Sequence, residues 1–349
     1  MNSNEFYFFG GFILFIILVL FLDLGIFRKK DRVVSAKEAG AWTLVWILLA
    51  LSFYFCVLHF GNRIHGVFSL EALEKIKTDY RQPFAIVAGN LEQSLANYRK
   101  ELGLEYITGY ILEESLSVDN IFVIILIFTA FGIQEKYYHK VLFWGILGAL
   151  VFRFLFIFTG AFLIAKFGWI LYIFAAFLIF TGFRMLFSRD SEEKIDTKNH
   201  PIIRLASRFF AVWPDFAGSL FFVKKDGRRY ITPLFLVLLI VEFTDLVFAV
   251  DSIPAIFAVT TDPYIVFFSN IFAIMGLRSI FFVLQSLVGK FRFFKTGLSI
   301  ILVYIGLKML LEEQLAEWGF TIVHSLLVIV SILTASTVAS FLFPVQKAE

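Results

Sequence analysis

The sequence predicts an all-α membrane protein of about nine transmembrane helices, in which two units of three helices form an inverted repeat. Hydrophobic residues make up 59% of the 349 residues, and the mean hydropathy is +0.83. Several apolar stretches reach the ~20 residues that a helix needs to cross a bilayer. Two segments in the middle of the chain also carry the same polar residues in the same order, which predicts the repeat.

Charge and cysteine content exclude several functional classes. The net charge is +3, but the basic residues lie in loops beside the apolar stretches, which indicates membrane topology and not nucleic-acid binding. Cys56 is the single cysteine, so the chain has no internal disulfide and no CxxC site. We therefore expect the lipid bilayer as a partner, no nucleic acid, no cofactor and no enzymatic activity.

Nine apolar stretches are the predicted spans. They cover residues 6–27, 40–61, 105–131, 141–165, 168–187, 231–259, 264–288, 293–311 and 320–343. The first lacks a basic segment before it, so we interpret it as an anchor and not as a cleaved signal peptide. Most loop Lys and Arg residues lie on the inner side if the N-terminus is outside and the C-terminus inside. This arrangement predicts a multi-pass protein of the cell inner membrane.

The spans divide the chain into six parts. These are two peripheral helices (1–61), an extracytoplasmic helical insert (62–104), repeat A (105–187), a cytoplasmic loop (188–230), repeat B (231–311), and the last helix with the C-terminus (312–349). The insert alternates charged and apolar residues, as a solvated helical cap does. The cytoplasmic loop contains Asp226-Gly227 between short apolar runs, which predicts a β-hairpin.

Polar residues at corresponding positions define the repeat. The matching pairs are Glu113 with Asp245, Asp119 with Asp251, Arg153 with Arg278, and Gly182 with Gly306. Because each copy has three spans, an odd number, the second copy must enter the membrane from the opposite side. Inverted repeats of this kind are typical of secondary transporters, whose binding sites lie near the middle of the bilayer.

Five carboxylates lie well inside the predicted spans: Glu113, Asp119, Glu242, Asp245 and Asp251. An acid at the centre of a membrane helix costs roughly 2.5–3.5 kcal/mol, so five unpaired acids would cost on the order of 10–17 kcal/mol. Arg153 and Arg278 are the predicted counter-ions. Two arginines do not neutralise five acids, and a divalent cation together with a proton would complete the balance.

The spacing of these acids predicts irregular helices. Six residues turn an ideal helix by about 600°, so Glu113 and Asp119 project about 120° apart. We therefore expect interruptions at Asp119-Asn120 and Asp251-Ser252, where Pro254 would favour the second break.

The predicted metal ligands are the five acids and Asn120. Oxygen ligands suit Mn²⁺, Mg²⁺ or Ca²⁺ better than Zn²⁺ or Cu⁺. The five histidines lie in loops or at the edges of spans, so we do not expect them to be ligands.

The sequence resembles the TerC family of integral membrane proteins, named for tellurium resistance, and is most similar to its Alx branch. Three stretches carry the resemblance: E-E-S-L-S-V-D-N (113–120), E-F-T-D-L-V-F-A-V-D-S-I-P-A (242–255) and S-N-I-F-A-I-M-G-L-R (269–278). It implies membership of the LysE-like transporter superfamily and export of manganese, and its essential acids fall on the same five positions.

The predicted function is export of a divalent metal cation, most suitably Mn²⁺, with H⁺ antiport as the expected coupling. A transporter of another cationic solute, such as an amino acid, and a non-transporting stress scaffold stay open as alternatives. An intramembrane aspartyl protease is disfavoured because the sequence lacks the G-x-G-D motif.

Overall fold

Long helices form most of the protein. The computed structural model describes residues 3–27, 34–187, 210–214, 217–225, 227–285 and 293–343. The elements are α1 (Ser3–Phe27), α2 (Ala36–Phe60), the 3₁₀ turn η1 (Gly61–Arg63), α3 (Leu70–Asp79), α4 (Leu91–Ala130), η2 (Glu135–Tyr137), α5 (Tyr138–Lys166), α6 (Ile170–Phe187), β1 (Ala211–Val212), β2 (Phe222–Lys225), β3 (Arg228–Ile231), α8 (Pro233–Phe257), α9 (Pro263–Gln285), α10 (Phe294–Leu310), α11 (Glu312–Glu317) and α12 (Ile322–Leu342).

The predicted class, an all-α membrane protein, is confirmed. Within the described ranges, six helical segments are long and apolar enough to cross a membrane, and they comprise α2, α5, α6, α8, α9 and α12. The apolar stretch Asn4–Leu20 of α1 is shorter, and α10 has 17 residues. Residues 106–130 of α4 carry three acids, which are Glu113, Glu114 and Asp119. The predicted number of nine spans is therefore not confirmed.

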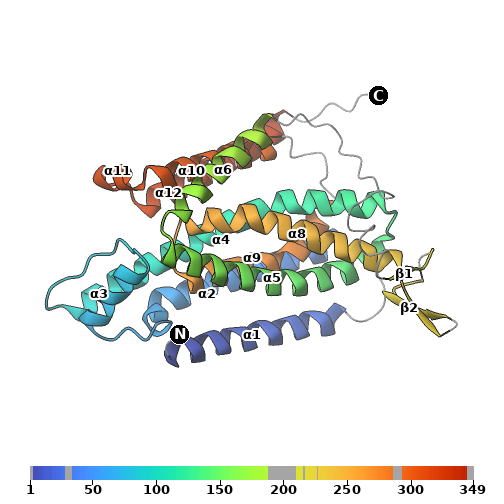
Figure 1. Ribbon diagram of the computed structural model, residues 1–349, viewed down its shortest axis with the longest axis horizontal. Coiled ribbons are helices and arrows are strands. Elements are labelled where there is room, and N and C mark those ends of the chain that lie inside the picture. Colours follow the sequence, from blue (N-terminus) through green and yellow to red (C-terminus); the bar gives the residue numbers. More distant parts are fainter. Residues whose placement is uncertain are drawn as a thin grey trace.

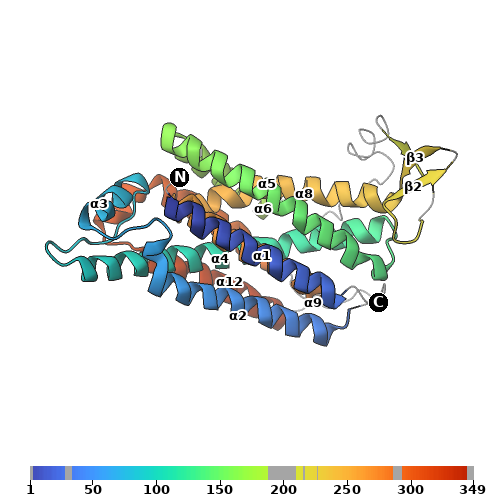
Figure 2. The same ribbon diagram turned by 90° about the horizontal axis from the view of Figure 1, so that it is seen from below.

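The two structured loops lie at opposite ends of the bundle. Helix α3 lies at one end of the long axis, and the three strands lie at the other (Figures 1 and 2). Strands β2 and β3 pair as an antiparallel hairpin, and β1 joins β3 in parallel to give the order β1-β3-β2. Gly227 has a φ of +77° in the turn between β2 and β3, a conformation that glycine adopts without strain. This arrangement suits segments on opposite sides of a membrane.

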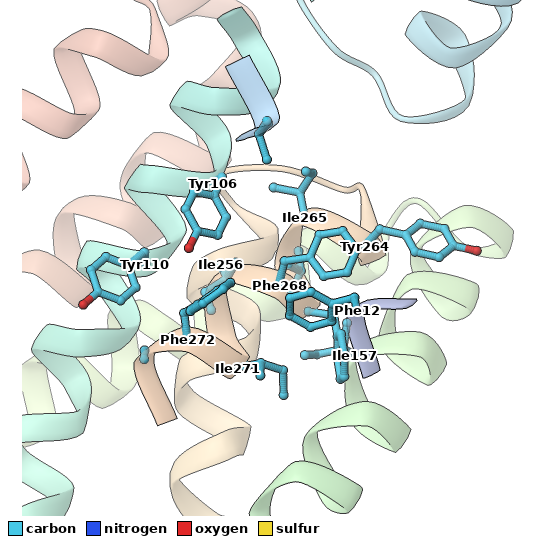
Figure 3. Packing of buried hydrophobic residues seen from close by; sticks show 14 of the residues in the cluster. Phe12, Tyr106, Tyr110, Ile157, Ile256, Tyr264, Ile265, Phe268, Ile271 and Phe272 are labelled. Carbon is cyan, nitrogen blue, oxygen red and sulfur yellow. The ribbon is translucent and has the colours of Figure 1, made fainter. Parts of the chain in front are cut away.

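Helix α9 forms the centre of the bundle. It packs against α2, α4 and α5, and 94% of its most apolar stretch is buried. Aromatic side chains fill the space around it, with the rings of Phe12 and Phe268 only 4.4 Å apart (Figure 3). A helix that is apolar on all sides is buried on all sides, which explains the position of α9.

Helices α6 and α10 cross at two glycines. A Cβ atom at Gly182 of α6 would lie 2.8 Å from the backbone oxygen of Ser299 in α10. A Cβ atom at Gly306 of α10 would lie 2.7 Å from the backbone oxygen of Ala175 in α6. Only glycine allows the two backbones to approach this closely. The contact is reciprocal. In α6 the glycine follows Ala175 by seven residues, and in α10 it follows Ser299 by seven residues, so each helix contributes one glycine and one backbone oxygen at the same spacing.

The predicted helix interruptions are wrong. Helix α4 runs without a break through Asp119-Asn120, and α8 runs through Asp251-Ser252 to Phe257. Pro254 lies in the last turn of α8, where its missing N–H removes one ladder hydrogen bond close to the point at which the helix ends. The ladder therefore tolerates the proline.

Candidate functional site

Arg153 of α5 is the central residue of the site. Its side chain is fully buried, and its guanidinium forms a salt bridge with Glu113 of α4. Nη2 of Arg153 also lies 3.5 Å from Oδ1 of Asp245 in α8. A buried charge needs a partner of opposite sign. Through the Arg153 guanidinium, these contacts join Glu113 of α4 to Asp245 of α8.

Asn270 of α9 holds the same ion pair from another side. Its Oδ1 accepts a hydrogen bond from Arg153 Nη1 at 3.0 Å, and its Nδ2 donates to Oε2 of Glu113, also at 3.0 Å. Ser252 Oγ lies 3.4 Å from Arg153 Nη1. The sequence analysis missed Asn270, although an asparagine inside the apolar run of α9 was a detectable signal.

Glu242 and Asp245 lie on the face of α8 that packs against α5. The carboxylate of Glu242 fills the space beside Gly148, where a Cβ atom would come within 2.1 Å of its oxygens. Among the described residues, Oε2 of Glu242 and Oδ2 of Asp245 have no hydrogen-bond partner. Gly148, which the sequence analysis did not single out, therefore makes room for a carboxylate with an oxygen available to a ligand.

The other predicted ligands lie nearby in the sequence but are less completely described. Asn120 is buried in α4, and its Nδ2 has no hydrogen-bond partner in the part of the chain that the structure describes. The side chains of Asp119 and Asp251 lie outside the described residues. Arg278 is buried in α9 and lines a small pocket together with Trp42, Trp46 and His139.

Glu114 of α4 is half-buried, and the sequence analysis did not single it out. It neighbours Glu113, and its Oε2 has no hydrogen-bond partner among the described side chains. Its other oxygen approaches Gly276 of α9. A buried carboxyl oxygen without a partner is costly in the bilayer, so we include Glu114 in the candidate site.

The arrangement combines three carboxyl groups with one guanidinium. Glu113 and Asp245 contact Arg153, and Glu242 lies one turn of α8 away from Asp245. Across the described ranges, no three acid, histidine or cysteine side chains are close enough together to hold a metal ion. The reason is visible in the contacts, because the guanidinium lies between carboxylates from α4 and α8. In the described site, the carboxylates bind a cation, and that cation is the guanidinium of Arg153.

Comparison with known proteins gives consistent matches. Residues 98–348 match the family described as "Integral membrane protein TerC family". The "Uncharacterized membrane protein STKORF319" of Myxococcus xanthus is 44% identical over 333 residues, which cover 95% of this chain and 91% of that protein. The "Putative membrane-bound redox modulator Alx" of Escherichia coli K12 is 40% identical over 305 residues, covering 87% of this chain and 85% of the relative. The protein of the same name in Salmonella typhi is 38% identical over 330 residues, covering 94% and 92%. No solved structure matches the chain.

Proposed function

Because the chain belongs to the TerC family of integral membrane proteins, we propose that it is a transporter, not an enzyme, that exports a divalent metal cation from the cytoplasm. Mn²⁺ is the cation that best fits the proposal. The observation that carries it is the position of Arg153, a buried positive group held between acids of α4 and α8. Carboxylates gathered around an internal cation form a site that a transported cation can take over.

The donor atoms at the site favour a hard cation. Glu113, Glu242 and Asp245 offer carboxylate oxygens, while Ser252 and Asn270 add neutral oxygens within reach of Arg153. No histidine or cysteine is among these described groups. Oxygen ligands suit Mn²⁺, Mg²⁺ and Ca²⁺, and Asp119, Asp251 and Asn120 are proposed to complete the coordination.

The packing of the two halves supports transport by alternating access. Helix α4 packs on α9, α5 on α8, and α6 on α10, so each helix of repeat A pairs with a helix of repeat B. The reciprocal glycine contacts at Gly182 and Gly306 are those that a two-fold relation between the halves would produce. In transporters built from inverted repeats, one half rocks against the other around a fixed site.

The proposed cycle exchanges one cation for another. Metal binding requires Glu113 and Asp245 to release Arg153 and requires any protonated carboxyl group to lose its proton. When the metal leaves on the outer side, Arg153 returns and protons rebind. The arginine thus prevents the empty site from exposing uncompensated acids to the bilayer. Proton antiport follows from the same exchange.

A redox role is the second candidate, since relatives carry the name of redox modulator. Cys56 is the single cysteine of this sequence, so the chain holds no dithiol of its own. It lies half-buried in α2. A redox effect of this protein would therefore act through its cargo.

The test is metal flux through purified protein in liposomes. Mn²⁺ should enter vesicles that contain the wild-type protein, and Glu242→Gln or Asp245→Asn should reduce the initial rate at least tenfold. The matched control is Glu74→Gln, which changes an exposed acid on α3. In cells under Mn²⁺ load, expression should lower the intracellular manganese content. A level or higher content would reject export.

A further inference from the structure

A second buried charge cluster lies outside the site described above, at the end of the bundle that carries α3. Its centre is His65, in the turn that follows η1. The turn is closed by hydrogen bonds between Val67 N and Asn62 O at 2.8 Å and between Asn62 Nδ2 and Val67 O at 3.2 Å. Gly66 has a φ of +67°, and a Cβ atom there would lie 2.0 Å from the side chain of Asn4. The turn is therefore pressed against the start of α1.

Both ring nitrogens of His65 contact carboxylates. Nδ1 lies 3.0 Å from Oε1 of Glu5 in α1, and Nε2 lies 2.9 Å from Oδ2 of Asp262 in the turn between α8 and α9. The His65 and Asp262 side chains are fully buried. A neutral imidazole carries only one N–H, so it can donate to only one of these acids. With both acids ionised, the two contacts are hydrogen bonds at once only when the imidazole is doubly protonated.

The carboxylates have further partners that hold them in place. Asp262 Oδ1 accepts from the backbone N–H of Tyr264 at 2.9 Å, and Glu5 Oε2 accepts from the Tyr264 hydroxyl at 3.2 Å. Tyr264 lies at the edge of the aromatic cluster around α9 (Figure 3). The ring of Tyr80, at the end of α3, lies 5.1 Å from the imidazole. Three distant parts of the chain thus meet at one histidine.

The titratable groups around His65 come from every element packed against it. They are Glu5 of α1, Tyr80 after α3, Asp262 of the α8–α9 turn and Tyr264 of α9, while Tyr98 and Glu105 of α4 interact with Asp262. Glu105 accepts a separate hydrogen bond from Gln82 at 2.9 Å. Burial raises the pKa of the Tyr80 hydroxyl far above its ordinary value, so this group stays neutral. For His65, burial lowers the pKa, but Asp262 and Glu5 outweigh it and raise the pKa to about 9.

We propose that Glu5, His65 and Asp262 form a proton-binding latch, which ties the α8–α9 turn to η1 and to α1 while the imidazole is protonated. Loss of the proton turns one ring nitrogen into a lone pair facing a carboxylate, so one of the two contacts becomes repulsive and the latch opens. Helix α8 carries Glu242 and Asp245 and ends five residues before Asp262. The transport consequence, which rests on the proposed function, is that alkaline conditions free this end of α8 and ease access to the site from this side.

The direction of the pH effect follows from the two states of the histidine. The latch is closed at neutral and acidic pH, because the imidazolium is stabilised by both acids. It opens as the pH rises through about 9. Removing one of the acids should lower this midpoint by about one pH unit, because a nearby opposite charge raises a histidine pKa by roughly that amount or more.

The test uses a nitroxide spin label in the full-length protein in liposomes. Cys56→Ser removes the native thiol, and Phe68→Cys places the label on an exposed residue next to the His65 turn. Label mobility is recorded from pH 6 to pH 10.5 without any metal. With the latch otherwise intact, mobility should rise with a midpoint near pH 9. Glu5→Gln should lower the midpoint by about one unit, and His65→Gln should give a mobile label at every pH.

The control is His59→Gln, which changes an exposed histidine whose ring nitrogen contacts the Phe55 carbonyl of its own helix and no acid among the described residues. It should leave the midpoint unchanged. The latch is refuted if mobility does not change with pH, if Glu5→Gln keeps the same midpoint, or if the transition persists in His65→Gln. Because this experiment contains no metal, it is independent of the flux assay. If label mobility changes with pH as expected but Mn²⁺ flux is absent, only the transport proposal is refuted. If Mn²⁺ flux is present but label mobility does not change with pH, only the latch is refuted.

Discussion

Replacement of Arg153 by glutamine tests whether the described site is held together by its internal cation. The guanidinium is fully buried and contacts Glu113, Asp245 and Asn270. Its loss leaves two acids in the bundle with no positive partner among these contacts. Removing one partner of a buried ion pair costs about 3–5 kcal/mol. We therefore expect Arg153→Gln to lower the free energy of unfolding by that amount.

A double variant separates charge from packing. Arg153→Gln combined with Glu113→Gln removes both charges and keeps most of the side-chain volume. The combined loss should be smaller than the sum of the single losses by about 1–3 kcal/mol, because the two side chains are in direct contact. The measurement is reversible unfolding in mixed detergent micelles. Arg184→Gln, at an exposed position of α6, is the control and should change stability by less than about 0.5 kcal/mol.

Metal addition connects this experiment with function. In Arg153→Gln, a divalent cation can neutralise the acids that the arginine has left. Mn²⁺ at about 100 times its dissociation constant should restore about 2.7 kcal/mol of stability. An additive double variant, or an Arg153→Gln protein as stable as the wild type, would refute the reasoning about the ion pair. The absence of any Mn²⁺ effect would argue against a metal site at this position.

Three further predictions follow from single contacts. Gly182→Ala should destabilise the α6–α10 crossing by about 1–3 kcal/mol in the same unfolding measurement, because its Cβ would lie 2.8 Å from a backbone oxygen. Gly10→Ala is the control and should have little effect, because Gly10 has open space around it. Gly148→Ala should displace the Glu242 carboxylate and weaken Mn²⁺ flux more than stability, and equal flux in variant and wild type would contradict this role. The pKa of His65 is about 9 in the folded protein, against an ordinary value of 6.5. Protonated His65 therefore contributes about 3 kcal/mol to the free energy of unfolding; this contribution is complete below pH 6.5 and is lost as the pH rises through 9. If the stability of a His65→Gln protein falls in the same way at alkaline pH, this prediction is wrong.

The sequence alone determined the class of the protein and the presence of a polar centre. Long apolar runs leave a chain few choices besides the bilayer, since their burial in a soluble core of this size would be impossible. Acids inside such runs are costly and must face one another or a cation, which is why Glu113, Asp245 and Arg153 were identifiable from their positions. The hairpin signal Asp-Gly is likewise local, and β2 and β3 pair around it.

Local spacing was a poor guide to helix continuity. The interruptions at Asp119-Asn120 and Asp251-Ser252 were inferred from the 120° between acids, but α4 and α8 are continuous. A backbone hydrogen-bond ladder is lost only when neighbouring groups can replace its bonds, and in the bilayer few can. A straight helix can instead direct its acids toward two different neighbouring helices.

Only the tertiary structure decided which side chains meet. Arg153 reaches Asp245, 92 residues away, and Asn270, 117 residues away. His65 contacts Glu5, 60 residues before it, and Asp262, 197 residues after it. In the sequence, His65 does not differ from an ordinary loop histidine. In the folded protein, the start of α1 and the α8–α9 turn enclose it. The physical reason is that the packing of whole helices decides which side chains come into contact. The axial position of one helix against the next is set by contacts such as the glycine crossing of α6 and α10, and the sequence near one residue does not encode such contacts.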